Sequence, residues 1–357
     1  MNEPALVLDV LKVFGLASFS FFVAFFLTPI LTHYLYKYKL WPKRIERESL
    51  GGGPATVIAG LAKERTHIDT PRMGGILIWG TVFIITALFW FLGKFFDGPL
   101  FTKLNYLSRG QTWLPFFAMM SASLIGLADD WLQIKGRGGY VGGGLLLTIR
   151  ITLVALLGLV GALWFYGPLE HSGVVIPFYG ELELGIFFIP FFILTMLALF
   201  STGVVDGLDG LAGGVIGPVI AAYGGIAFFQ HQLDLAAFLG VIGGALLAFL
   251  WYNIPPARFY MGESGILGLT SMLTVVAFLT DGVAVLPIIA FPLAIETLSV
   301  IIQIGSKRLR GKKVFLAAPL HHHFEAKGWP HYKVTMRFWV VSLVMALVGM
   351  VVHVIGR

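Results

Sequence analysis

Long apolar runs, separated by polar segments, recur along the whole chain. A helix needs about 20 apolar residues to cross the hydrocarbon core of a bilayer. The alternating short segments that are typical of a closed β-barrel do not recur in this pattern. The sequence therefore predicts an all-α polytopic integral membrane protein with about ten transmembrane helices, in which residues 1–357 form a single domain. The predicted spans lie near residues 14–36, 73–93, 112–131, 145–166, 185–204, 211–229, 235–254, 264–280, 283–304 and 335–356.

The composition supports a surface that mostly faces lipid. Of the 357 residues, 57% are hydrophobic and only 12% are charged, whereas about a quarter of a soluble domain is charged. The chain has no cysteine, which excludes disulfides and thiolate metal sites. Its first apolar run is long enough to span, so we interpret it as a retained helix rather than a signal peptide.

Most of the 25 lysines and arginines fall in segments on one side of the predicted spans. The positive-inside rule places these segments in the cytoplasm, and an even number of spans then puts both termini outside the cytoplasm. The net charge of +6 reflects this topology, so we expect no nucleic-acid partner. The predicted cytoplasmic loops lie near residues 37–72, 132–144, 205–210, 255–263 and 305–334.

Five acidic residues stand at the cytoplasmic ends of the predicted spans: Asp129, Asp130, Asp206, Asp209 and Glu263. An ionised side chain at the centre of a membrane helix costs roughly 2.5–3.5 kcal/mol, so acids from three separate loops on one face indicate a site. Oxygen-rich sites without thiolates suit Mg²⁺, or alternatively Mn²⁺. On a helix, Asp129 and Asp130 point about 100° apart, so one can face the site while the other faces a neighbouring helix.

Each acid also has a simpler interpretation. An acidic pair at a helix end is often just solvated. Asp209 is a candidate cap for the helix expected to begin near Leu211, and Glu263 is favourable at the N-terminus of the next helix because of the helix dipole.

The longest basic loop contains three consecutive histidines, His321, His322 and His323. Their alternating directions make a three-histidine metal chelate awkward, so recognition of a polyphosphate is better motivated. The lysines of this loop also fit a topology signal or a patch for anionic lipids.

Longer strings in the same region resemble a known family. Residues 318–330 read Ala-Pro-Leu-His-His-His-Phe-Glu-Ala-Lys-Gly-Trp-Pro, after Glu-Thr-Leu-Ser-Val-Ile-Ile-Gln from Glu296 and before Arg-Phe-Trp from Arg337. Together with the Asp-Asp pair and the Asp-Gly-Leu-Asp-Gly element from Asp206, they resemble the bacterial phospho-N-acetylmuramoyl-pentapeptide transferases. That family belongs to the polyprenyl-phosphate sugar-1-phosphate transferase superfamily. The resemblance runs from about residue 20 to the C-terminus.

The resemblance implies an enzyme of peptidoglycan synthesis. It would transfer phospho-MurNAc-pentapeptide from UDP-MurNAc-pentapeptide to undecaprenyl phosphate, giving lipid I and UMP. The resemblance also implies Mg²⁺ dependence, a homodimer, and a place in the bacterial cytoplasmic (inner) membrane with the active site facing the cytoplasm.

Site roles follow for the residues that match the family's motifs. Expected catalytic residues are Asp129, Asp130 and His321, and expected metal ligands are Glu263 and Asp129. Expected substrate-binding residues are Thr70, Asp206, Asp209, Asn253, Gln303, His322 and His323. Tyr260 is added as a stacking partner for uracil, although it also fits an interfacial aromatic belt. Lys63 is added as a replacement for a family lysine whose place holds His67.

Several positions depart from the family's pattern. Glu263 stands where the family has an aspartate ligand, while Gly203 and Phe200 replace asparagines. Arg150 is a candidate replacement for a lysine that is missing after Asp130. The alternatives are a GlcNAc-1-phosphate transferase of the same superfamily, a catalytically inactive binding protein, and a proton-coupled transporter, for which Glu296 is the acid inside a span.

Overall fold

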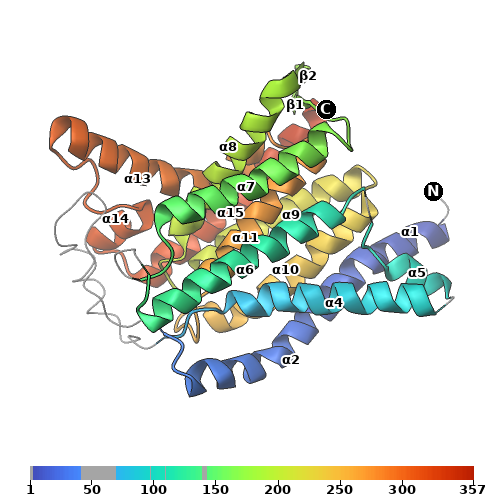
Figure 1. The fold of residues 1–357 in the computed structure, drawn as a ribbon, viewed down its shortest axis with the longest axis horizontal. Helices are drawn as coiled ribbons and strands as arrows, with labels where there is room; N and C mark the ends of the chain where they lie inside the picture. The colour runs from blue at the N-terminus through green and yellow to red at the C-terminus, as the bar shows by residue number, and fades with distance from the viewer. Residues whose placement is uncertain (1–2, 42–69, 97, 109, 139–142) are drawn as a thin grey trace.

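The computed structural model describes residues 3–41, 70–96, 98–108, 110–138 and 143–357, and these form a bundle of long helices (Figure 1). In chain order, the first helices are α1 (Glu3–Val10), η1 (Leu11–Gly15), α2 (Leu16–Lys37), α4 (Gly75–Phe95), α5 (Pro99–Leu104), α6 (Trp113–Lys135) and α7 (Leu147–Tyr166). The remaining helices are η2 (Gly185–Phe187), α8 (Phe188–Ser201), η3 (Thr202–Val205), α9 (Leu211–Phe229), α10 (Leu233–Asn253), α11 (Gly262–Leu279), α12 (Leu286–Ile289), α13 (Phe291–Arg310), α14 (Leu320–Ala326) and α15 (His331–Gly356).

Eight helical segments of the described chain are long and apolar enough to cross a membrane. They confirm the prediction of a helical, multi-pass membrane protein. The two other predicted spans, near 112–131 and 283–304, are helical as well, in α6 and in α12 with α13. Charged residues interrupt the apolar character of these two spans, notably Asp129 and Asp130 in α6. The eight segments are Val7–Lys37, Gly75–Phe95, Leu147–Tyr166, Gly185–Val205, Leu211–Phe229, Leu233–Asn253, Gly262–Leu279 and His331–Gly356.

Helix α11 is the buried centre of the bundle, and nearly all of its side chains are inside the protein. Small residues let its neighbours approach closely, as is common between membrane helices. A Cβ atom on Gly126 of α6 would overlap the carbonyl group of Glu263, and one on Gly75 of α4 would overlap the backbone of Gly265. The close packing fixes the first turn of α11 against the ends of α4 and α6.

In helix α13 the polar face is buried and an apolar face is exposed, which is the reverse of a soluble amphipathic helix. Its buried face carries the polar side chains of Glu296, Ser299 and Gln303, whereas Leu298 and Ile301 on the other face are exposed. This pattern suits a helix whose outer face meets lipid and whose polar groups find partners inside the protein.

The structure adds two elements that the sequence did not predict, a β-hairpin and a short helix in an expected loop. An antiparallel hairpin pairs β1 (Gly173–Ile176) with β2 (Gly180–Glu183), in the register Gly173 to Glu183. The hairpin packs beside the C-terminus, where the Phe178 amide donates to the Gly356 carbonyl at 2.7 Å. The histidine segment is the short helix α14 rather than an irregular loop. In Figure 1 the hairpin and the C-terminus lie close together at the top of the view, and α14 lies at the left.

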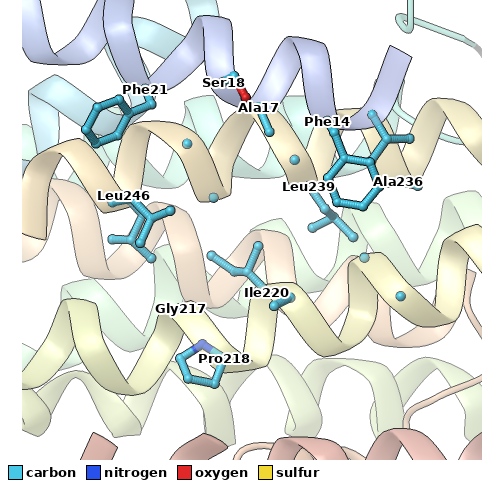
Figure 2. Close-up of a pocket in the computed structure, with 18 of the residues that line it drawn as sticks. Phe14, Ala17, Ser18, Phe21, Gly217, Pro218, Ile220, Ala236, Leu239 and Leu246 are labelled. Atoms are coloured by element: carbon cyan, nitrogen blue, oxygen red, sulfur yellow. The ribbon is translucent and has the colours of Figure 1, made fainter. Parts of the chain in front are cut away.

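An apolar groove of about 980 Å³ runs between α2, α9 and α10. Phe14, Ala17 and Phe21 line one side, and Ile220 and Leu246 lie across from them (Figure 2). Glycines make up much of the remaining wall, at positions 213, 214, 217, 224, 225, 240, 243 and 244. Trp339 of α15 also lines the groove, and its indole N–H donates to the Gly210 carbonyl at 3.0 Å. Trp339 therefore links the wall of the groove to the loop that carries Asp206 and Asp209.

Candidate functional site

Two of the predicted acids bind the first turn of α11. The Asp130 carboxylate is fully buried and accepts hydrogen bonds from the backbone amides of Glu263 and Ser264, both at 3.0 Å. The Asp206 carboxylate accepts from the Gly262 amide at 2.9 Å. The first amides of a helix have no partner within the helix and favour negative charge. Asp130 of α6 and Asp206 of the loop before α9 therefore cap α11 from two directions.

The backbone at Gly262 requires glycine. Its φ angle is +72°, a conformation that side chains make unfavourable. A Cβ atom there would also lie 2.6 Å from Oδ2 of Asp130. The Met-Gly-Glu segment thus brings the backbone close to Asp130 and places Glu263 at the start of the helix.

Asp129 points away from Asp130 and is fully buried as well. It accepts from Nε2 of Gln133 at 2.6 Å and from the Leu145 amide at 2.7 Å. Arg150, in the first turn of α7, lies near the same carboxylate, with Nη1 at 3.8 Å from its Oδ2. The same Nη1 is 2.9 Å from Oε1 of Glu263. Two carboxylates from α6 and α11 thus converge on one guanidinium group.

Asp209 and Asn253 tie the acidic loop to the segment before α11. The Asp209 carboxylate accepts from the Tyr260 hydroxyl at 2.7 Å and from the Ala257 amide at 3.1 Å. Asn253 accepts from the Gly210 amide at 3.1 Å and donates to the Phe259 carbonyl at 2.8 Å. Asp209 is half-buried, as is Tyr260, so both remain accessible to a ligand.

Arg72 joins this network, although its sequence position suggested only a topology signal. It donates to Oε1 of Gln133 at 2.8 Å, and Gln133 in turn binds Asp129. Burial raises the pKa of the Asp206 carboxyl, and the positive charge of Arg72 opposes that rise. Two signals were available in the sequence: Arg72 lies two residues after Thr70, an expected substrate-binding residue, and Gln133 lies one helical turn after Asp129. Thr70 itself is buried beside Arg72.

His321 faces the acidic loop from the opposite side. Its Nδ1 lies 2.9 Å from Oε2 of Glu296, and its amide donates to Oε1 of Glu296 at 3.1 Å. Both side chains are fully buried. Within the described part of the chain, Nε2 of His321 has no hydrogen-bond partner. It faces Gly207, where a Cβ atom would come within 2.7 Å of it.

The pairing gives Glu296 a role that the sequence did not suggest. A carboxylate that holds one ring nitrogen fixes the orientation of the imidazole and leaves the other nitrogen for a ligand. The acid inside this span therefore has a defined partner, His321, whose ring it orients.

His322 faces the same loop from further away, since a Cβ atom on Gly207 would lie 3.6 Å from its Nε2. Its Nδ1 lies 2.7 Å from Oε2 of Glu325. His323 and Gln303 bind the chain before α14 instead. His323 accepts from the Leu316 amide at 3.1 Å, and burial lowers its pKa. Gln303 accepts from the amides of Val314 and Phe315, both at 3.0 Å, so it holds the segment that leads to α14. Lys63 lies outside the described residues.

The described residues contain no group of three or more His, Asp or Glu side chains arranged to hold a metal ion. Mg²⁺ usually needs only one or two carboxylates, with substrate phosphates and water as its other ligands. Asp129 and Glu263 are the two carboxylates that converge, and Arg150 lies between them. These two residues fit the protein's share of a magnesium site, provided that the guanidinium leaves room.

Comparison with known proteins shows relatives that match most of the chain. The chain is 34% identical to a phospho-N-acetylmuramoyl-pentapeptide-transferase of Chloroflexus aggregans, over 97% of this chain and 91% of the relative. The chain belongs to the phospho-N-acetylmuramoyl-pentapeptide-transferase family. Members from Chloroflexus aurantiacus and Dichelobacter nodosus are 36% and 35% identical, over 79% and 80% of this chain and 76% and 81% of their own length.

A broader family model, glycosyl transferase family 4, matches residues 112–281. This range runs from α6 to α11 and contains all five acids. The Glu296–His321 pair lies beyond it. The matched range thus includes the five acids and Arg150, whereas Arg72 and the histidine helix α14 lie outside it.

Proposed function

We propose that this chain transfers phospho-MurNAc-pentapeptide from UDP-MurNAc-pentapeptide to undecaprenyl phosphate, giving lipid I and UMP. The observation that carries the proposal is the junction of α6, α9 and α11, where five carboxylates lie with Arg72 and Arg150 at one end of an apolar bundle. The names of relatives that match most of this chain support the choice of substrates.

In the proposed reaction, a phosphate oxygen of the lipid attacks the β-phosphorus of the nucleotide sugar. A new oxygen–phosphorus bond forms, the bond to the bridging oxygen breaks, and UMP leaves with that oxygen. Such transfers depend on positioning and on neutralising phosphate charge. Magnesium, held by Asp129 and Glu263, would supply positive charge to the phosphates.

The chain's own groups have distinct roles in this proposal. Arg72 and Arg150 attract the phosphates, and Asp129 orients the lipid phosphate. His321 presents Nε2 as a donor or acceptor to the sugar diphosphate. Tyr260 and Asp209 face the nucleotide. Asp130 acts indirectly, because its carboxylate is used to hold the start of α11.

UMP release from purified protein, Mg²⁺, undecaprenyl phosphate and UDP-MurNAc-pentapeptide tests the function directly. We expect Asp129→Asn to lower the rate at least about 100-fold. Asp281→Asn is the matched control, because Asp281 pairs with Arg357 in a contact outside this network. A near wild-type rate for Asp129→Asn would contradict its catalytic role. Turnover of UDP-GlcNAc in place of the muramoyl substrate would favour the GlcNAc-1-phosphate transferase.

We also propose ten spans in the bacterial inner membrane, both termini outside, a cytoplasmic site and a homodimer. The absence of cysteine makes single-cysteine labelling a clean test. Lys312→Cys should be shielded from a membrane-impermeant maleimide in intact cells, whereas Tyr179→Cys at the exposed hairpin tip should react. The reverse pattern would contradict the proposed orientation. Crosslinking in native membranes tests the homodimer.

A further inference from the structure

Among the residues that the structure describes, Arg150 is the positively charged group that pairs with both expected metal ligands. It stands in the first turn of α7 and is largely buried. Its Nη1 lies 2.9 Å from Glu263 and 3.8 Å from Asp129. The Asp129 side chain is fully buried, whereas 27% of the Glu263 side chain is exposed. The group formed by Arg150, Asp129 and Glu263 is thus shielded from solvent at Asp129 and accessible to solvent at Glu263.

A divalent cation held by Asp129 and Glu263 would lie next to the Arg150 guanidinium. Mg²⁺ binds oxygen at about 2.0–2.1 Å in a compact octahedral shell. The Glu263 oxygen nearest to the guanidinium is already used in the ion pair. Two positive groups a few ångström apart in a partly buried site repel each other strongly. Binding of the metal therefore requires Glu263 to release Arg150, or the guanidinium to move toward another anion.

The extra methylene of Glu263 matters for this contact. A glutamate extends one carbon further from the backbone than an aspartate, and here it reaches across to α7. The Glu263 backbone is fixed by Asp130, which accepts from its amide. A shorter side chain at the same place would draw its carboxylate back from Arg150.

We propose that Arg150 is a built-in cation that competes with the divalent metal for Asp129 and Glu263, and so sets the metal concentration that the site requires. The inference rests on the proposed magnesium site. When the diphosphate arrives, it offers Arg150 a second anion, so substrate and metal binding become coupled. In the substrate-free protein the positive charge of Arg150 offsets the negative charges of Asp129 and Glu263.

Binding of Mn²⁺ to the purified, substrate-free protein tests the inference by electron paramagnetic resonance, independently of turnover. Arg150→Met should bind Mn²⁺ at least about tenfold more tightly than the wild type, because the competing charge is gone. Arg150→Lys should stay near wild type. Arg137→Met is the matched control, since Arg137 is exposed in the loop after α6, and it should leave the affinity unchanged.

Two further variants keep the test decisive. Adding Glu263→Gln to Arg150→Met should abolish the gain in Mn²⁺ affinity. If Arg150→Met does not fold, Glu263→Asp should still raise Mn²⁺ affinity, because its carboxylate withdraws from the guanidinium. Unchanged or weaker binding in Arg150→Met, or in Glu263→Asp when Arg150→Met is unfolded, would overturn the inference. UMP release without any divalent cation would also overturn it, but would leave the proposed transfer intact.

Discussion

Two buried acid–base pairs lie at the same end of the molecule and differ in how completely they are enclosed. Glu296 and His321 are both fully buried, and Glu296 binds both the ring and the backbone amide of His321. Glu263 and Arg150 share one ion pair, and the Glu263 side chain is partly exposed. The comparison indicates that the first pair builds the wall of the site, while the second stays available to ligands.

The largest expected effect is on the fully buried pair, Glu296 and His321, which is called the enclosed pair below. Glu296→Ala leaves two buried donors of His321 without their partner, and removal of one member of a buried pair typically costs about 3–5 kcal/mol. We expect a large fall in the unfolding temperature in detergent and loss of UMP release. Glu183→Ala on the exposed strand β2 is the control and should unfold like the wild type. An unfolding temperature for Glu296→Ala close to that of the wild type would show that the pair does not hold α14 in place.

The second prediction separates the two adjacent aspartates, which looked equivalent in sequence. Asp130→Asn leaves one of the two first-turn amides of α11 without an acceptor, which costs about 1–3 kcal/mol for a buried group. Asp129→Asn should destabilise less, because its remaining oxygen can still accept from the Leu145 amide and only a side-chain donor, that of Gln133, loses its acceptor. Thermal unfolding and UMP release, measured on both variants, should show a larger stability loss for Asp130→Asn and a larger loss of rate for Asp129→Asn. The opposite ranking would contradict the assignment of Asp130 as a cap.

The third prediction concerns the partly exposed pair, Glu263 and Arg150. Glu263→Gln keeps an oxygen that can accept from Arg150, and partly exposed ion pairs contribute about 1 kcal/mol or less. We expect its stability to change far less than that of Glu296→Gln, the same substitution in the enclosed pair. The rate of UMP release and its dependence on Mg²⁺ should change instead. Unchanged metal dependence in Glu263→Gln would remove Glu263 as a ligand.

The sequence was sufficient for those features that depend on local pattern. Apolar runs gave the spans, and acids at the ends of three spans indicated the cluster, because a buried charge in a membrane protein needs a reason. The partners of those acids could not be predicted in the same way. Arg150 and Glu263 are 113 residues apart, and Asp130 binds amides 133 and 134 residues away. Such pairs follow from how the helices pack, which no spacing along the chain reveals.

The same limit explains the histidine region and Tyr260. Three histidines in a row suggested one shared role, but one short helix sends them to different partners: Glu296, Glu325 and the Leu316 amide. Tyr260 fitted an aromatic belt equally well from sequence. Its bond to Asp209 places it within the site, while its contact with uracil stays a prediction.

The smallest expected effect concerns Asp206, whose pKa is raised by burial despite Arg72. A carboxyl with a raised pKa in the folded state destabilises the fold when it is ionised, and that cost disappears as the pH falls from neutral toward the ordinary carboxyl range of about 3.9. Asp206→Asn keeps an oxygen for the Gly262 amide and carries no charge. We expect its unfolding temperature to be slightly above that of the wild type at neutral pH, with the gap closing as the pH is lowered. Asp281→Asn, which removes a partly exposed ion pair, should show no such gain. If the difference in unfolding temperature between Asp206→Asn and the wild type widened on acidification, the Asp206 carboxylate would be stabilised in its ionised form. The charge of Arg72 would then outweigh the effect of burial at this loop.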